Sequence, residues 1–186
     1  MKKFLTITLT VLTLFLSLQA KEIGGVKLND SILIDNQKLI LNGAGIRSIF
    51  FFDVYVGALY LKDRSNSDKK IIVQNEPMDI KMVITSSMVT SSKMIDGMKE
   101  AFEKSKKSGY DINKSLIDRF LTTFKEKISK GDIYDFLYTP GKGVEIYKNQ
   151  KLLQTIDDFS FKKALFAIWL GKYPAQESLK KKMLGL

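Results

Sequence analysis

The stretch from residue 49 to residue 61 constrains the fold of this 186-residue chain more than any other segment. Successive side chains of a strand point to opposite faces, and the even positions here form one wholly apolar face. The odd positions form a second face that is mostly apolar but includes Asp53 and Tyr55. A strand that is apolar on both sides is typical of a sheet covered on both faces. The pattern therefore predicts a long central strand whose few polar groups need partners or a function.

The rest of the chain alternates between strand and helix patterns. Period-two patterns predict a hairpin within residues 26–41 and strands at residues 78–85, 132–139, 144–147 and 152–156. Helical spacing predicts helices at residues 94–102, 113–128 and 159–170, and a short helix from Pro174. Strands, two helices, strands and two helices indicate an α+β domain with a mainly antiparallel sheet.

Two segments are interpreted as turns. Asn42-Gly43-Ala44-Gly45 contains two glycines, which tolerate positive φ and so favour a sharp turn before the long strand. Residues 63–70 are mostly polar and are interpreted as a surface turn.

The first twenty residues have the layout of a secretory signal peptide. Lys2 and Lys3 precede an apolar run at residues 4–18, and charged residues follow directly after Ala20. The run is shorter than the about 20 apolar residues of a membrane span. We expect cleavage after Ala20, leaving an exported domain at residues 21–186 that is not integral to the membrane. An uncleaved N-terminal anchor is the alternative.

The composition excludes several classes of function. The chain has neither histidine nor cysteine, which excludes disulfides, a lipid-modified cysteine and nucleophilic sites built on histidine or cysteine. The usual zinc ligands and calcium loops are missing too, so we expect no metal and no cofactor. The formal net charge is +10, but the lysines are spread along the chain. This spread favours a solvated basic exterior over a nucleic-acid site, and we expect no nucleic-acid partner.

Two motifs near the ends of the domain carry a family resemblance. Residues 42–47 (Asn-Gly-Ala-Gly-Ile-Arg), the strand at residues 51–61, and residues 166–174 (Phe-Ala-Ile-Trp-Leu-Gly-Lys-Tyr-Pro) resemble the chalcone-isomerase-like proteins, specifically their exported bacterial branch. The family includes plant chalcone isomerases and fatty-acid-binding relatives. The resemblance implies an open-faced β-sandwich, in which a layer of helices covers a mainly antiparallel sheet and a ligand cleft lies between them.

The resemblance also implies ligand-binding positions. Arg47 matches an arginine that the plant isomerases place at the cleft, and Tyr55 falls where the fatty-acid-binding relatives have a tyrosine. A tyrosine and an asparagine of the isomerases match Thr90 and Gly97 here, and neither residue can do their chemistry. Lys93 is a candidate for a second positive charge, although a solvated lysine is the commoner role. No catalytic residue is assigned.

Arg47 also supports a ligand on physical grounds. A guanidinium beside an apolar strand is costly unless a negative group meets it, and a carboxylate fits it through paired hydrogen bonds. We therefore expect a non-catalytic protein that binds a small hydrophobic carboxylate such as a fatty acid. In the structural alternative, Arg47 pairs with Asp53 and no ligand is needed. The functional alternatives are an intramolecular lyase of the chalcone isomerase type and an envelope structural or interaction protein without a small ligand.

Four aromatic residues near the expected cleft are better explained as core. Tyr134, Phe136 and Tyr138 share one face of a strand, and Trp169 lies in an apolar helix. Aromatic residues in such positions usually pack in the interior, so we expect packing before ligand contact.

Overall fold

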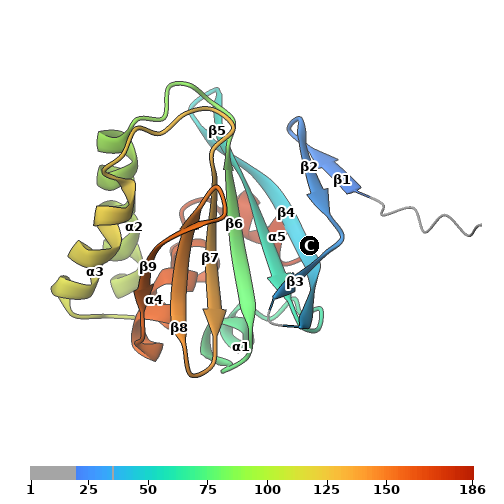
Figure 1. Cartoon of the computed structure of the whole chain (residues 1–186), viewed down its shortest axis with the longest axis vertical. Helices are drawn as coiled ribbons and strands as arrows, with labels where there is room; N and C mark the ends of the chain where they lie inside the picture. The colour runs from blue at the N-terminus through green and yellow to red at the C-terminus, as the bar shows by residue number, and fades with distance from the viewer. Residues whose placement is uncertain (1–19, 35) are drawn as a thin grey trace, which may run out of the picture.

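The computed structural model of the chain describes residues 20–34 and 36–186. The expected signal peptide lies outside the described residues, apart from Ala20. The described residues form a curled seven-stranded antiparallel sheet in the order β3-β4-β5-β6-β7-β8-β9, a two-stranded hairpin β1-β2, and five helices (Figure 1). The strands are β1 (Ala20–Ile23), β2 (Val26–Asn29), β3 (Ser31–Ile34), β4 (Gln37–Ile49), β5 (Phe52–Leu61), β6 (Met78–Ile84), β7 (Ile133–Thr139), β8 (Gly143–Lys148) and β9 (Lys151–Ile156). The helices are α1 (Asp68–Val73), α2 (Ser91–Lys107), α3 (Lys114–Leu121), α4 (Phe159–Leu170) and α5 (Glu177–Met183), and a 3₁₀ turn covers Thr122–Phe124.

The two faces of the sheet bury separate apolar cores. The larger core joins one face of the sheet to the helical layer, and α4 lies in it with its apolar residues buried from Phe161 onward. The smaller core joins the opposite face to residues of β1, β2 and β3. The expected α+β fold, a mainly antiparallel sheet under a layer of helices, is confirmed.

The predicted alternation along the central strand is confirmed over most of its length. Tyr55 and Leu59 belong to the helix-side core, whereas Val56 and Tyr60 belong to the smaller core. Both faces are buried there because β5 lies between β4 and β6, with a packed layer on each side.

The predicted strand is wrong at its beginning, because the chain reverses at Phe50 and Phe51. Ile49 ends β4 and pairs with Phe52, the first residue of β5. Phe50 has a φ of 55° and Phe51 is 97% exposed. Sequence alternation failed here because a turn made of phenylalanines has the same apolar pattern as a strand.

The turn expected at Asn42–Gly45 is also wrong, because these residues lie inside β4. Neither Gly43 nor Gly45 has a positive φ. Their small size is instead required by α5, which packs on this part of the strand. A Cβ on Gly43 would lie 2.8 Å from the Met183 carbonyl oxygen, and one on Gly45 would lie 2.8 Å from the Cβ of Lys182.

Two helix boundaries differ from expectation. The helix predicted to reach Ile128 ends its α-helical part at Leu121. The hydroxyls of Thr122 and Thr123 donate to carbonyl oxygens three residues back, at 2.7 Å each, which competes with further helix. The polar segment at residues 63–70 contains the start of α1, which Ser67 caps.

Within residues 20–34 and 36–186, no helix has both the length and the apolar character needed to cross a bilayer.

Candidate functional site

A cavity of about 380 Å³ lies between α2 and the end of the β4–β5 hairpin. Its walls are mainly apolar, and its charged lining residues are Arg47 and Lys93. The lining consists of Arg47, Ile49, Phe50, Phe52, Val54, Tyr55, Met88, Val89, Lys93, Met94, Gly97, Met98, Ala101, Ile168 and Ala175. Its size falls within the range of about 300–1,000 Å³ that is usual for small-ligand sites.

An irregularity in the hairpin shapes this cavity. Arg47 pairs with Tyr55, but the next pair is Ser48 with Asp53, so Val54 is an extra residue on β5. Such a β-bulge breaks the alternation of faces. Val54 and Phe52 therefore line the same cavity as Tyr55, which corrects the prediction that they face away from it.

Arg47 and Tyr55 converge from neighbouring strands. They are direct cross-strand partners, and both line the cavity. The Tyr55 hydroxyl oxygen accepts a hydrogen bond of 3.0 Å from Trp169 Nε1, so its proton remains to donate elsewhere. Burial raises the pKa of Tyr55, and the Trp169 hydrogen bond and the nearby Arg47 charge offset only part of that rise. The phenol is therefore a hydrogen-bond donor at neutral pH.

The positive charge of Arg47 meets neutral acceptors. Its Nη1 donates to Gln176 Oε1 at 2.9 Å and to the Ser48 carbonyl oxygen. Gln176 Oε1 also accepts from the Ser48 backbone N–H at 3.0 Å, which fixes the amide in place.

The alternative ion pair of Arg47 with Asp53 does not form. Asp53 Oδ1 instead accepts a hydrogen bond of 2.7 Å from the Ser48 hydroxyl. Glu100 on α2 forms its ion pair with Lys104, at 2.8 Å. This contact lowers the pKa of Glu100, and the Arg47 charge makes a smaller contribution in the same direction. Among the described residues, no carboxylate oxygen lies within ion-pair distance of the Arg47 guanidinium.

The other two predicted ligand residues differ in their placement. Lys93 lines the cavity, and its Nζ donates to the Met88 carbonyl oxygen at 3.2 Å. Thr90 does not line the cavity. Its hydroxyl oxygen accepts from the Lys93 backbone N–H at 3.3 Å and caps α2.

Sequence reasoning missed two residues of the site. Gln176 precedes α5 and orients Arg47, and no pattern in the sequence marks it. Trp169 was expected to pack first and to contact a ligand second, whereas it hydrogen-bonds Tyr55, and its place in the closing motif was the available signal. Tyr134, Phe136 and Tyr138 lie in the larger core and not in the cavity wall.

The two positions that the resemblance matches to isomerase side chains are filled differently here. Thr90 is occupied as a helix cap and Gly97 has no side chain, so neither supplies the acid–base groups of the isomerases. Over the described residues, no cluster of three or more potential ligands is placed to hold a metal ion. The arrangement offers the Arg47 guanidinium, the Lys93 ammonium group, the Tyr55 phenol as a donor, and an apolar cavity.

Comparison with known proteins agrees with this architecture. A crystal structure of a fatty-acid binding protein from Arabidopsis thaliana matches with a TM-score of 0.66 and 15% identity, over 83% of this chain and 95% of that chain. At that identity the likeness shows a shared fold. A search of curated proteins found no match. The family model described as chalcone isomerase-like matches residues 20–185. The chain therefore belongs to the chalcone isomerase-like family.

Proposed function

We propose that this protein binds a hydrophobic carboxylate, a fatty acid in particular, in the cavity beside Arg47. The observation that carries the proposal is a guanidinium without a carboxylate partner among the described residues, at the wall of an apolar cavity of about 380 Å³. A ligand carboxylate supplies the missing charge, and the Tyr55 hydroxyl adds a hydrogen bond. The apolar lining then takes the hydrocarbon tail. The fatty-acid binding protein of the same fold supports this choice of ligand.

The proposal includes that the protein is non-catalytic. The positions that match the isomerase tyrosine and asparagine hold Thr90 and Gly97, so no general acid or base stands beside Arg47 in their place. An absorbance assay with a chalcone tests this point, and turnover above the spontaneous rate would assign the lyase activity instead.

The carboxylate site is tested by replacing Arg47 with alanine and titrating the protein with dodecanoate in a calorimeter. A hydrogen bond to a charged group contributes about 1.5–3 kcal/mol, so we expect Arg47→Ala to weaken binding roughly 10- to 100-fold. The exposed Arg64 provides the matched control, and Arg64→Ala should leave the affinity unchanged. Equal affinities for wild type and Arg47→Ala would exclude Arg47 as the anchor of the carboxylate.

A second variant tests the tail pocket separately from the head group. Gly97 lines the cavity, and a Cβ there would meet no atom within 4 Å. Gly97→Leu should therefore fold normally and fill the hollow, so that dodecanoate no longer binds. Gly97→Ala serves as the control, because it adds only a methyl group to the same helix.

We also propose that the chain is exported and acts in the periplasm after cleavage behind Ala20. The layout of residues 1–20 supports this. Mass spectrometry of the protein from a periplasmic fraction should give a chain that begins at Lys21. Recovery of a chain that retains residues 1–20 in the membrane fraction would favour the uncleaved anchor.

A further inference from the structure

The β4–β5 turn presents an unusual apolar tip. Phe50 is 92% exposed and Phe51 is 97% exposed, and the flanking Ile49 and Phe52 are about half exposed. Met88, on the connection between β6 and α2, is also exposed, and it lines the same cavity as Phe50. We call Ile49, Phe50, Phe51, Phe52 and Met88 the apolar tip. Single exposed apolar residues are ordinary, but contiguous exposed apolar patches mark interaction sites.

The residues of this turn are unfavourable for the stability of the fold. Phe50 adopts a φ of 55°, a conformation that favours glycine and asparagine and is strained for a bulky side chain. Its side chain gains little packing in return, because it is almost fully exposed. A strained residue without a packing benefit indicates a role outside the fold.

Several lysines lie on segments at the same end of the sheet as the apolar tip. Figure 1 places the β4–β5 turn, the β6–α2 connection and the segment between α3 and β7 at one end of the sheet. Lys125, Lys127 and Lys130 on the last of these segments, and Lys93 in the first turn of α2, are all exposed. Asp53 and Glu126 are the exposed acidic residues beside them, so positive charge is in excess at this end.

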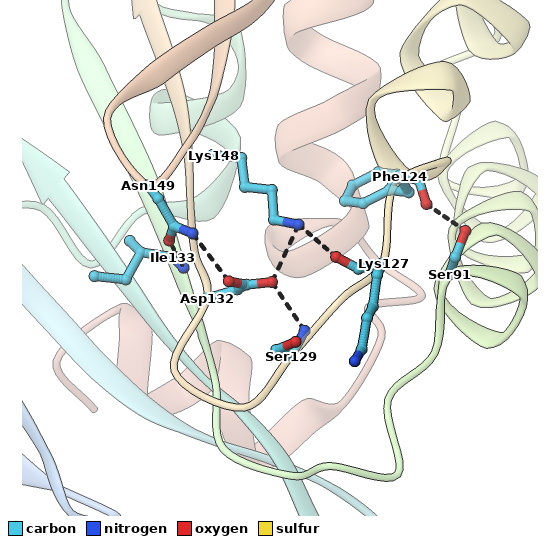
Figure 2. A network of polar contacts seen from close by, with 8 residues as sticks. All are labelled: Ser91, Phe124, Lys127, Ser129, Asp132, Ile133, Lys148 and Asn149. Carbon is cyan, nitrogen blue, oxygen red and sulfur yellow. Dashed lines mark hydrogen bonds and ion pairs between the residues drawn. The ribbon is translucent and has the colours of Figure 1, made fainter.

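A hydrogen-bond network holds the lysine-bearing segment in place. Asp132 accepts from Asn149 Nδ2 and from the Ser129 backbone N–H, each at 2.9 Å, and pairs with Lys148 at 3.1 Å (Figure 2). Lys148 also donates to the Lys127 carbonyl oxygen at 2.6 Å. The lysine side chains on this segment are therefore carried by a fixed loop beside the apolar tip.

We propose that the apolar tip docks this protein on an anionic lipid bilayer. Exposed aromatic residues inserted at the headgroup boundary, together with lysines that contact anionic headgroups, are the two contributions that bind proteins to membrane interfaces. The cavity is lined by Ile49, Phe50, Phe52 and Met88 of this same tip. Docking therefore places the cavity against the bilayer, where a hydrophobic carboxylate can pass between them without crossing water. This last consequence rests on the proposed function, whereas docking itself does not.

The experiment is co-sedimentation of the purified protein with vesicles of phosphatidylglycerol mixed with phosphatidylcholine. Phe51 belongs to the apolar tip but does not line the cavity, so Phe51→Ser tests docking without changing the ligand site. Removing one inserted phenylalanine should lower the partition coefficient about 10-fold. The matched control is Leu33→Ser, because Leu33 is 69% exposed and pairs with Lys38 at the opposite end of β4. It should partition like wild type.

A charge series completes the test. Replacing Lys125, Lys127 and Lys130 with glutamine should lower binding to these vesicles at least about 10-fold, and vesicles of phosphatidylcholine alone should bind all proteins weakly. The control replaces Lys62, Lys69 and Lys70, which are also exposed. Lys69 and Lys70 lie in α1 and Lys62 directly follows β5, at the other end of the sheet (Figure 1). This control should bind like wild type.

The outcomes separate docking from ligand binding. Equal partitioning of wild type and Phe51→Ser would overturn the docking proposal, whatever the dodecanoate affinity. Vesicle binding that depends on Phe51, in a protein with no dodecanoate affinity, would keep docking and overturn the proposed function. Sedimentation velocity without vesicles tests whether the apolar tip instead joins two copies of this protein. A dimer that Phe51→Ser dissociates would assign the tip to contact between two copies instead.

Discussion

At the scale of single residues, two buried polar groups on opposite faces of the sheet differ in how well they are hydrogen-bonded: Tyr55 faces the helix-side core, whereas Asp79 pairs with Tyr60 of the smaller core. Tyr55 has a hydrogen-bond partner in Trp169 and lies beside Arg47. Asp79 on β6 is 1% exposed, and neither of its carboxylate oxygens has a partner with hydrogen-bond geometry in the described chain. Burial raises the pKa of Asp79 well above its usual value, and the negative charge of Asp135 raises it further. Asp79 is therefore a source of instability that the fold tolerates.

Replacing Asp79 with asparagine should stabilise the protein at pH 8. A carboxyl whose pKa is raised by folding contributes a penalty that is absent below its unfolded pKa of about 4 and grows as pH rises toward its folded pKa. We expect Asp79→Asn to raise the free energy of unfolding by roughly 1–3 kcal/mol at pH 8 and to match wild type near pH 4. Urea denaturation at both pH values measures this difference. Asp96→Asn on the exposed surface of α2 is the control, and a gain that does not depend on pH would contradict the explanation.

The sequence identified Arg47 and Tyr55 individually, but their relationship needed the strand register. Arg47 was expected in a turn, whereas it lies on β4 directly opposite Tyr55. The pairing across the hairpin, and the bulge at Val54, depend on where the chain reverses. The sequence predicted a strand at that reversal, because Phe50 and Phe51 are aromatic and aromatic residues favour strands.

At the scale of elements, α4 is a helix that the pattern of apolar residues in the sequence predicted. Its residues are apolar on almost all sides, which predicted a buried helix from Phe159 to Leu170. Its bounds agree, and it is buried over most of its length, although Phe159 at its start is exposed. Lys162 lies within it and is fully buried. Its Nζ donates to the carbonyl oxygens of Ile71, Ile72 and Gln74, at 2.8–2.9 Å, where α1 ends. A lysine therefore joins α4 to the carbonyl end of α1.

Lys162→Met should destabilise the protein by about 2 kcal/mol, because the buried carbonyl groups at the end of α1 lose their donor. Burial lowers the pKa of Lys162 to about 7, and the three carbonyl oxygens offset part of the cost of that burial. Thermal unfolding at pH 7 measures the change. Lys163→Met is the neighbouring control and should have a small effect, since Lys163 is partly exposed. A Lys162→Met protein as stable as wild type would show that methionine packing compensates for the lost bonds.

At the scale of the whole molecule, the network around Asp132 ties together two segments, the loop that leads into β7 and the β8–β9 turn (Figure 2). Asp132 precedes β7, Ser129 lies in the loop before it, and Asn149 and Lys148 lie at the β8–β9 turn. Asn149 Oδ1 also accepts from the Ile133 backbone N–H at 2.8 Å. Partial burial raises the pKa of Asp132, but hydrogen bonds from Asn149 and Ser129 and the Lys148 charge outweigh this and lower the pKa overall.

Asp132→Asn should therefore cost stability at neutral pH but not in acid. A carboxyl whose pKa is lowered by folding stabilises the native state above its unfolded pKa of about 4, and this contribution is lost as pH falls through the folded pKa. We expect a loss of about 1 kcal/mol at pH 7 that shrinks toward zero below pH values of about 3. Guanidinium chloride titrations across this range measure it. A deficit that stays constant with pH would assign the effect to the amide geometry and not to the charge.

The sequence by itself determined the fold class, the buried α4, most of β5 and three of the polar residues at the cavity, namely Arg47, Tyr55 and Lys93. These features depend on local periodicity and on motifs, and each such pattern lies within a single segment of the chain. Only the tertiary structure decided that Gly43 lies in a strand against α5, that Gln176 and not Asp53 meets Arg47, and that the phenylalanine turn stands at the cavity wall. Each of these outcomes depends on contacts between segments far apart in the chain, and no local pattern of side chains encodes such a contact.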